Sequence, residues 1–218
     1  MKIGIIGAGH IGGTLTRRLK ALGHDVSVAN SRGPETLGAL VKETGARATT
    51  VADAARDKDV VIVTIPEKSV PDLRKELAGA IAPNTVVVDT GNYYPKRDGK
   101  IADIESGIPE SQWVADQLGR PVVKAFNTIY AQHLLERGKP TGERDRIALP
   151  VAGDDARAKQ VVMKLIDELG FDGVDAGGLA DSWRQQPGTP VYGADLDADR
   201  AKRALSEAKS ERKPEFRA

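Results

Sequence analysis

The chain alternates between short apolar runs and segments with helical periodicity. Residues 2–6 form an apolar, β-branched run that is typical of a strand buried on both faces. Apolar side chains then recur at helical spacing up to Leu22, where Gly23 can end a helix, and residues 26–29 form a second apolar run. The first thirty residues therefore predict a strand, a helix and a second strand in direct succession.

The same alternation continues through most of the chain. Further apolar runs predict strands at residues 46–50, 60–65, 85–89, 122–125, 146–152 and 171–175. Helical patterns separate them, at residues 34–44, 51–56, 66 to 77 or 80, 106–118 and 154–169. Strands and helices that alternate at this interval predict a parallel sheet with right-handed crossovers, and hence a doubly wound α/β fold.

Length and turn-rich segments suggest how the fold is divided. A chain of 218 residues can hold one domain with a small extension. We expect residues 1–150 to form the parallel-sheet domain and residues 151–218 a small C-terminal α/β extension, unless both form one continuous domain. Residues 91–113 show no apolar period and predict a loop that acts as a lid or substrate rim. Residues 196–209 show a thin helical stripe, and residues 209–218 are expected to fray.

A glycine motif joins the first predicted strand to the first predicted helix. The segment Gly7-Ala8-Gly9-His10-Ile11-Gly12 has the spacing G-x-G-x-x-G. In such a motif Gly7 allows a tight turn, Gly9 lets a pyrophosphate approach the backbone, and Gly12 lets the helix lie close to the strand. Free N–H groups at the start of the helix, those of Ile11 and Gly12, then bind the negative charge. Because strand, turn and helix follow in the required order, the motif predicts a dinucleotide site.

The end of the second strand indicates which dinucleotide binds. A site for NAD usually has an acidic residue here, whose carboxylate accepts a hydrogen bond from the ribose 2′-hydroxyl. This chain has Asn30 instead, followed by Ser31 and Arg32. Arg32 can form a charge-assisted pair with a 2′-phosphate, Ser31 can donate to it, and Thr36 is a third candidate contact. We therefore predict NADP(H), the alternative being that Arg32 is a solvated residue in a turn.

The remaining candidate site residues follow the later strands, because parallel α/β sheets bind ligands outside the carboxyl ends of their strands. Neutral hydrogen-bonding side chains, suited to a carboxamide and to ribose hydroxyls, are Thr64, Asn92 and Asn127. Apolar neighbours that would line a nicotinamide or a second ring are Ile65, Pro66, Ala125 and Phe126. We predict the nicotinamide and acceptor pocket at Asn92, Phe126 and Asn127, although each asparagine can instead cap a turn.

Composition excludes several classes of function. A net charge of +1 with 29% charged residues provides no electrostatic reason to expect nucleic acid or membrane as a partner. The absence of cysteine excludes disulfides, thiolate metal sites and a cysteine nucleophile, and no metal site is predicted. No apolar run approaches a membrane span, and the first strand begins too early for a leader peptide, so we expect a cytoplasmic protein.

Acid–base side chains are scarce near the predicted site. Of the three histidines, His10 lies in the glycine motif, where it packs or contacts the cofactor, and His24 and His133 are expected at the surface. Reducing a carbonyl or imine usually needs a positioned proton donor, whereas a flavin or deazaflavin ring accepts hydride directly. Proximity and alignment of two rings would then supply most of the catalysis. The sequence therefore favours hydride transfer between rings, with no catalytic acid or base.

Segments spread over residues 1–185 resemble a known family. They are Gly7-Ala8-Gly9-His10-Ile11-Gly12, Ser31-Arg32, Val123-Lys124-Ala125-Phe126-Asn127, Pro150-Val151-Ala152-Gly153-Asp154-Asp155, Gly170-Phe171, Val174-Asp175-Ala176-Gly177 and Leu179-Ala180-Asp181-Ser182-Trp183. They resemble the coenzyme F420-dependent NADP oxidoreductases, which pass hydride between NADPH and a deazaflavin. They are also similar to the cytosolic NADPH-binding domain of the six-transmembrane ferrireductases.

The resemblance implies a Rossmann fold and a set of ligands. It implies NADP(H) held at the 2′-phosphate by Ser31 and Arg32, with Asn127 beside the nicotinamide. The second substrate, a small-molecule hydride acceptor, would be coenzyme F420 or a flavin such as FAD or FMN. The resemblance also implies a homodimer, in which the second subunit partly covers the acceptor.

Three functions stay open on the sequence, and a reductase of deazaflavin or flavin is favoured. The second is an NADPH-dependent reductase of a small imine or keto acid, although such enzymes usually append a long helical domain for which too few residues follow Trp183. The third is a non-enzymatic sensor of NADP(H). Lys124, inside a predicted strand, is expected to pair with a carboxylate rather than donate a proton, and Trp183 is expected to pack.

Overall fold

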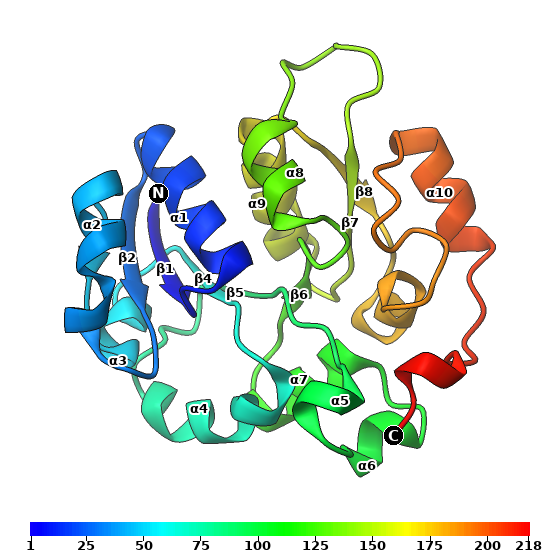
Figure 1. The fold of residues 1–218 in the computed structure, drawn as a ribbon, viewed down its shortest axis with the longest axis horizontal. Coiled ribbons are helices and arrows are strands. Elements are labelled where there is room, and N and C mark those ends of the chain that lie inside the picture. Colours follow the sequence, from blue (N-terminus) through cyan, green and yellow to red (C-terminus); the bar gives the residue numbers. More distant parts are fainter.

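The computed structural model describes residues 1–218 and contains a six-stranded sheet beside a two-stranded one (Figure 1). The strands are β1 (Lys2–Ile6), β2 (Asp25–Ala29), β3 (Arg47–Ala48), β4 (Val60–Val63), β5 (Val86–Asp89), β6 (Val123–Lys124), β7 (Ala148–Val151) and β8 (Asp172–Asp175). The larger sheet has the order β3-β2-β1-β4-β5-β6, and all of its pairs are parallel. This is the doubly wound Rossmann arrangement, which confirms the predicted fold class.

Helices connect the strands as the alternating pattern predicts. They are α1 (His10–Ala21), α2 (Gly38–Thr44), α3 (Val51–Ala55), α4 (Val70–Leu77), α5 (Pro95–Asp98), α6 (Ala102–Glu105), α7 (Glu110–Leu118), α8 (Ala131–Glu136), α9 (Ala156–Glu168) and α10 (Ala198–Ser206). Short 3-10 helices lie at Pro34–Leu37, Glu67–Ser69, Leu179–Gln185 and Pro214–Phe216. None of the helices combines the length and the apolar character that crossing a membrane requires.

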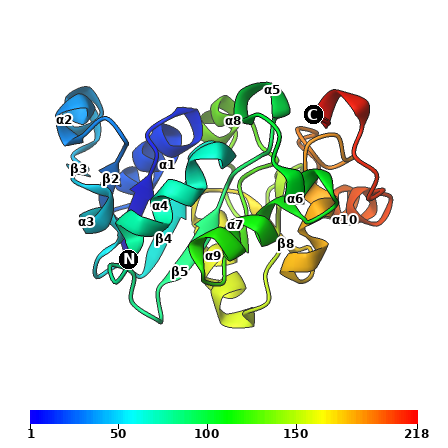
Figure 2. The same cartoon turned by 90° about the horizontal axis from the view of Figure 1, so that it is seen from below.

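The larger sheet is buried on both faces, because alternate side chains of its central strands enter different cores. Val60 and Ile62 of β4 belong to a core cluster that includes side chains of α1, α8 and α9. Val61 and Val63 belong to a second cluster, with side chains of α3, α4 and α7. Figures 1 and 2 show α4, α7 and α6 in succession along the same side of the molecule, with the two chain termini at opposite ends.

The smaller sheet, β7 with β8, is attached to the larger one by backbone and core contacts. Lys124 of β6 and Ala152 exchange both backbone hydrogen bonds, at 2.8 and 3.1 Å. One core cluster contains Leu15 of α1 as well as Val162 of α9 and Phe171. The boundary predicted at residue 150 falls inside β7, and this core extends across it.

Two segments differ from what the sequence predicts. Residues 91–113 are not a loop without structure, because they contain α5, α6 and the start of α7, and Tyr93 within them is fully buried. Residues 209–218 do not fray but pack back against α6 and α7, where the backbone N–H of Ala218 donates to Glu105 Oε1 at 3.0 Å. This contact joins residues that are 113 positions apart in the sequence, so no local sequence pattern predicts it.

Candidate functional site

In the glycine turn between β1 and α1, one glycine has space for a side-chain atom and two do not. Gly7 has φ +108°, and a Cβ there would lie 2.4 Å from the carbonyl oxygen of Thr64. A Cβ on Gly12 would lie 1.8 Å from the carbonyl oxygen of Gly7. A Cβ on Gly9 would meet no atom within 4 Å. Gly7 and Gly12 are therefore required by packing, whereas Gly9 borders free space of the kind that a diphosphate needs.

The N-terminus of α1 points unpaired backbone donors toward that space. The first bond of the helix runs from the N–H of Gly13 to the carbonyl of Gly9, at 2.8 Å. The N–H groups of His10, Ile11 and Gly12 therefore have no partner within the helix, and no side chain caps them. The helix dipole adds partial positive charge at the same end. The turn thus fits an anionic group, as the motif predicts.

A cavity of about 450 Å³ lies beside this turn. Its walls come from the carboxyl ends of β1, β2 and β4 and from α3 and α4. The lining residues are Ile6, Gly7, Ala8, Gly9, Asn30, Ser31, Arg32, Val51, Thr64, Ile65, Pro66, Ser69, Asp72, Leu73 and Glu76. The structure therefore brings together most of the predicted residues of the first, second and fourth strand ends. We call this space the nucleotide cavity.

The sequence prediction missed the wall that α4 and the turn before it provide. Ser69, Asp72, Leu73 and Glu76 line the nucleotide cavity and stand at positions i, i+3, i+4 and i+7, which is the spacing of one helix face. That periodicity is visible in the sequence. It cannot by itself show that this face turns toward the strand ends rather than toward solvent.

The turn after β2 presents Ser31 and Arg32 to the nucleotide cavity. Asn30 holds the turn: its Oδ1 accepts from the N–H of Arg32 at 3.0 Å, and its Nδ2 donates to Thr36 Oγ1 at 2.9 Å. Thr36 Oγ1 in turn donates to the carbonyl of Gly33 at 2.8 Å, and Thr36 does not line the cavity. Ser31 and Arg32 are exposed, and Arg32 forms no ion pair. Thr36 thus supports the turn, whereas Arg32 is free to bind an anion.

Asn92 and Asn127 lie together at the ends of β5 and β6, but their amides bind one another. Asn127 Nδ2 donates to Asn92 Oδ1 at 3.0 Å and to the carbonyl of Gln185 at 2.7 Å. Gln185 Nε2 donates back to Asn127 Oδ1 at 2.9 Å. Asn127 is 4% exposed, so its amide fastens the Leu179–Gln185 helix to the strand ends. The sequence prediction missed Gln185, which lies 58 positions away.

Phe126 does not have the role that its position predicts. Its side chain is 1% exposed and belongs to the core cluster of α1, α8 and α9, so neither face of its ring is open to a ligand. The backbone at Phe126 has φ +62°, which bends the chain directly after β6. The neighbouring Ala125 is also fully buried. Both residues pack the strand end, while Thr64, Ile65 and Pro66 face the nucleotide cavity as predicted.

A buried cluster of charged side chains lies behind the strand ends. Lys124 Nζ contacts Asp89 Oδ2 at 3.1 Å and donates to the carbonyl of Gly91 at 2.6 Å, which confirms that Lys124 pairs with a carboxylate. Glu67 and Glu110 complete the cluster, and both are 0% exposed. Neither carboxyl oxygen of Glu67 has a hydrogen-bond partner.

Burial controls the protonation of this cluster. Burial, with a further contribution from the charge of Asp89, raises the pKa of Glu67 well above its usual value. Burial also raises the pKa of Glu110. Burial opposes the charge on Lys124, but the three carboxyls outweigh it and raise the pKa of its ammonium group. Lys124 is therefore a charged partner of Asp89 and not a proton donor at neutral pH.

Comparisons with known proteins agree with this geometry. Residues 2–93 match the model of a family described as NADP oxidoreductase, coenzyme F420-dependent. The structure of a hypothetical protein, SMa0349, from Sinorhizobium meliloti superimposes with a TM-score of 0.77 and 33% identity, covering 88% of this chain and 93% of that one. A putative F420-dependent NADP-reductase from Arthrobacter sp. FB24 superimposes with a TM-score of 0.71 and 25% identity, covering 84% and 87%.

The chain is also similar to part of a longer protein. It is 30% identical over 183 residues to the metalloreductase STEAP3 of Rattus norvegicus, a match that covers 82% of this chain and 34% of the rat protein. The matches to curated relatives span between 34% and 51% of the length of those proteins.

Proposed function

Because residues 2–93 match the family of coenzyme F420-dependent NADP oxidoreductases and the chain superimposes on a putative F420-dependent NADP-reductase, we propose that it transfers hydride between NADP(H) and a deazaflavin or flavin acceptor. The observation that carries the proposal is the nucleotide cavity, with open space at Gly9 and with Ser31 and an unpaired Arg32 on its wall. Bare backbone suits the diphosphate, and a free guanidinium suits the 2′-phosphate. The bound dinucleotide supplies the hydride.

The residues of the chain would bind and align the reactants. The N–H groups at the start of α1 hold the diphosphate, and Arg32 holds the 2′-phosphate. Thr64 Oγ1 donates to the carbonyl of Gly7 at 2.8 Å and keeps the glycine turn in place. A ring acceptor needs no proton from the protein at the moment of transfer, which agrees with the neutral amides of Asn92 and Asn127 at the strand ends.

A reductase of small imines or keto acids is the second candidate, and one observation favours it. The hydroxyl groups of Tyr94 and Tyr192 contact each other, and Tyr94 follows the strand end that carries Asn92. Phenols are usual proton donors in carbonyl and imine reduction. Burial raises the pKa of Tyr192, however, so this hydroxyl holds its proton tightly and is a weak acid for such a step.

Turnover with different acceptors tests the proposal. The purified chain is mixed with NADPH and, separately, with F420, FMN, FAD or a cyclic imine, and loss of the reduced nicotinamide band is recorded. Reactions without protein are the control. We expect oxidation of NADPH with a deazaflavin or flavin and none with the imine. Turnover with the imine alone would favour the second candidate, and tight NADPH binding without any turnover would favour a sensor.

A further inference from the structure

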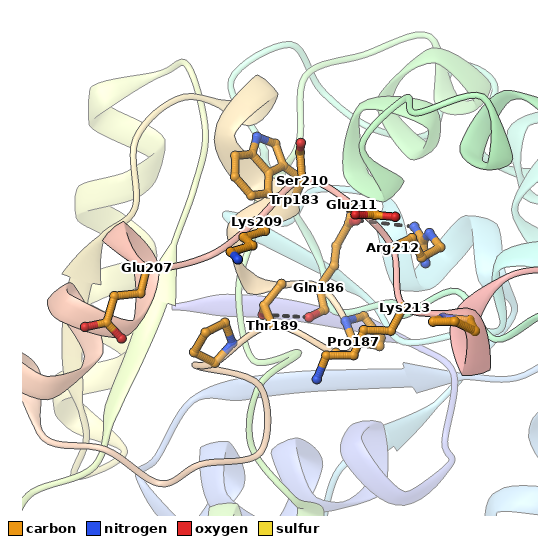
Figure 3. A pocket seen from close by; sticks show the side chains of 13 residues that line it. Trp183, Gln186, Pro187, Thr189, Glu207, Lys209, Ser210, Glu211, Arg212 and Lys213 are labelled. Atoms are coloured by element: carbon orange, nitrogen blue, oxygen red, sulfur yellow. Dashed lines mark hydrogen bonds between the residues drawn. The ribbon is translucent and has the colours of Figure 1, made fainter.

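A second cavity, of about 500 Å³, lies beside the Leu179–Gln185 helix, where Trp183 and Gln186 line it (Figure 3). It is enclosed between the turn at residues 186–190 and the C-terminal segment, by which we mean residues 209–218. It shares no lining residue with the nucleotide cavity. Trp183 is the single aromatic side chain on its wall. We call it the tail cavity.

The C-terminal segment is anchored where it closes the tail cavity. Arg212 Nη1 contacts the buried Glu110 Oε1 at 2.9 Å, and the guanidinium lies 5.3 Å from the ring centroid of Tyr93. Arg212 Nη2 also donates to Gln186 Oε1 at 3.3 Å. Farther along, the ring of Phe216 lies 6.3 Å from that of Tyr94. Charge, aromatic and hydrogen-bond contacts thus fix this wall, so the tail cavity is a built feature of the fold.

The free polar groups of the tail cavity suit an anion. Lys209 and Lys213 line it and form no ion pair, whereas the charge of Arg212 is offset by Glu110 and that of Glu211 by Arg217, at 3.3 Å. Glu207 is the only other acidic residue on the wall, so positive charge is in excess. Gln186 is 8% exposed, and its Nε2 donor has no partner.

We propose that the tail cavity binds the phosphate-bearing part of an aromatic ring acceptor of the flavin type. Lys209 and Lys213 would pair with the phosphate, Gln186 would donate to the polar chain, and Trp183 would stack on flat parts of the ligand. The identity of the ligand rests on the proposed function. The tail cavity also adjoins the strand ends, because Gln185, the residue before Gln186, is bonded to Asn127.

A matched pair of ligands tests this inference in the absence of NADP(H). FMN and riboflavin share one ring system and differ by a phosphate, and stacking on an indole quenches their fluorescence. We expect FMN to bind about tenfold more tightly than riboflavin at low salt, a preference that shrinks as salt is raised. The double variant Lys209→Met, Lys213→Met should bind both ligands equally. The exposed Lys202 of α10 does not line the cavity, so Lys202→Met is the matched control.

Quenching should also depend on Trp183, so Trp183→Leu is expected to abolish it. Equal affinity of the unmodified protein for FMN and riboflavin would overturn the inference, whether or not the variants fold. Displacement of FMN by inorganic phosphate at equal concentration would overturn it as well, since the ring would then contribute nothing. Because these titrations contain no dinucleotide, they can succeed when turnover fails. Turnover of a deazaflavin without any FMN preference would reject this inference alone.

Discussion

The three motif glycines are required for two different reasons, protein packing at Gly7 and Gly12 and ligand space at Gly9, which the G-x-G-x-x-G spacing does not distinguish. A side chain at Gly7 or Gly12 would collide with backbone, so substitution there disturbs the fold before it affects any ligand. A Cβ at Gly9 would meet no atom within 4 Å, and Gly9 lines the nucleotide cavity. Gly9 is therefore the position at which ligand space can be filled while the fold is preserved.

We expect Gly9→Val to weaken the binding of both NADPH and NADH by about 100-fold or more, because the valine side chain occupies the space of the diphosphate. Thermal unfolding should stay close to that of the unmodified protein. Gly38→Val is the control, since Gly38 also has open space at its Cβ but does not line the cavity. Calorimetric titration measures both variants, and tight NADPH binding by Gly9→Val would contradict the assignment.

Arg32 makes the choice between the two dinucleotides testable. Its guanidinium forms no ion pair, so Arg32→Ala should remove a ligand contact and little else. We expect NADPH to lose about 10- to 100-fold in affinity and NADH less than about twofold, because a charge-assisted hydrogen bond contributes roughly 1.5–3 kcal/mol. Arg47→Ala, on the exposed edge strand β3, is the matched control. Equal losses for both dinucleotides would defeat the phosphate assignment.

At the scale of elements, the C-terminal segment shows how charge can fix a piece of chain that has no apolar stripe. Its contacts are made by Arg212 on Glu110 and Tyr93 and by Phe216 near Tyr94. Glu110 is fully buried and lies behind the strand ends, so the cation of the segment offsets a charge in the interior. Docking of the segment and ionisation of Glu110 are therefore coupled.

Arg212→Met should release the C-terminal segment. Removing one partner of a buried ion pair costs roughly 3 kcal/mol, less whatever Glu110 recovers by taking up a proton. We expect faster proteolytic cleavage within residues 209–218 and a lower midpoint of denaturant unfolding. Arg217→Met is the control, because its partner Glu211 is 82% exposed and such pairs contribute under about 1 kcal/mol. Identical cleavage of the two variants would show that Arg212 is not the anchor.

At the scale of the whole molecule, one buried cluster joins parts of the chain that are far apart in sequence. Glu67 follows β4, Asp89 ends β5, Lys124 belongs to β6, and Glu110 begins α7. Among these four residues three carboxyls face the single ammonium group of Lys124, and the carboxyl of Glu67 has no hydrogen-bond partner. The structure relieves the excess by keeping a proton on Glu67, as its raised pKa indicates, while Glu110 is paired with Arg212.

This cluster predicts a pH dependence with a definite sign. Glu67 ionises near its usual pKa of 4.5 in the unfolded chain but at a higher pH in the folded one. Above pH 4.5 the folded state therefore binds more protons, and its stability falls as pH rises toward the raised pKa. Glu67→Gln is neutral at every pH and removes this fall. The stability of Glu67→Gln relative to the unmodified protein should thus increase between pH 5 and pH 8, roughly the range over which a raised carboxyl pKa acts.

Denaturant unfolding at several pH values measures that difference. The pKa of Glu43 and that of Asp167 are lowered by contacts with Arg17 and Arg146, and their stabilisation is lost as pH falls. Both proteins share these pairs, so their effect cancels in the comparison. The exposed Glu136 provides the control variant, Glu136→Gln. A stability difference that stays constant with pH would show that Glu67 is ionised in the folded protein.

The sequence by itself determined the parts of this protein whose contacts are local. The glycine turn, α1 and the turn that carries Ser31 and Arg32 lie within one stretch of about thirty residues, so their order and spacing suffice to predict a dinucleotide site. The alternation of strands and helices likewise predicts the parallel sheet, because crossover geometry leaves few alternatives.

The tertiary structure decided everything that depends on distant partners. In the folded chain the amide of Asn127 is hydrogen-bonded to Gln185, and the ring of Phe126 is buried. The C-terminal segment contacts Glu110 through Arg212, which lies 102 positions away in the sequence. Such contacts depend on the path of the whole chain and not on local propensity. The sequence pattern around an asparagine at a strand end is the same whether its side chain binds a ligand or another amide. Only the packing of the folded chain decides which of these partners it has.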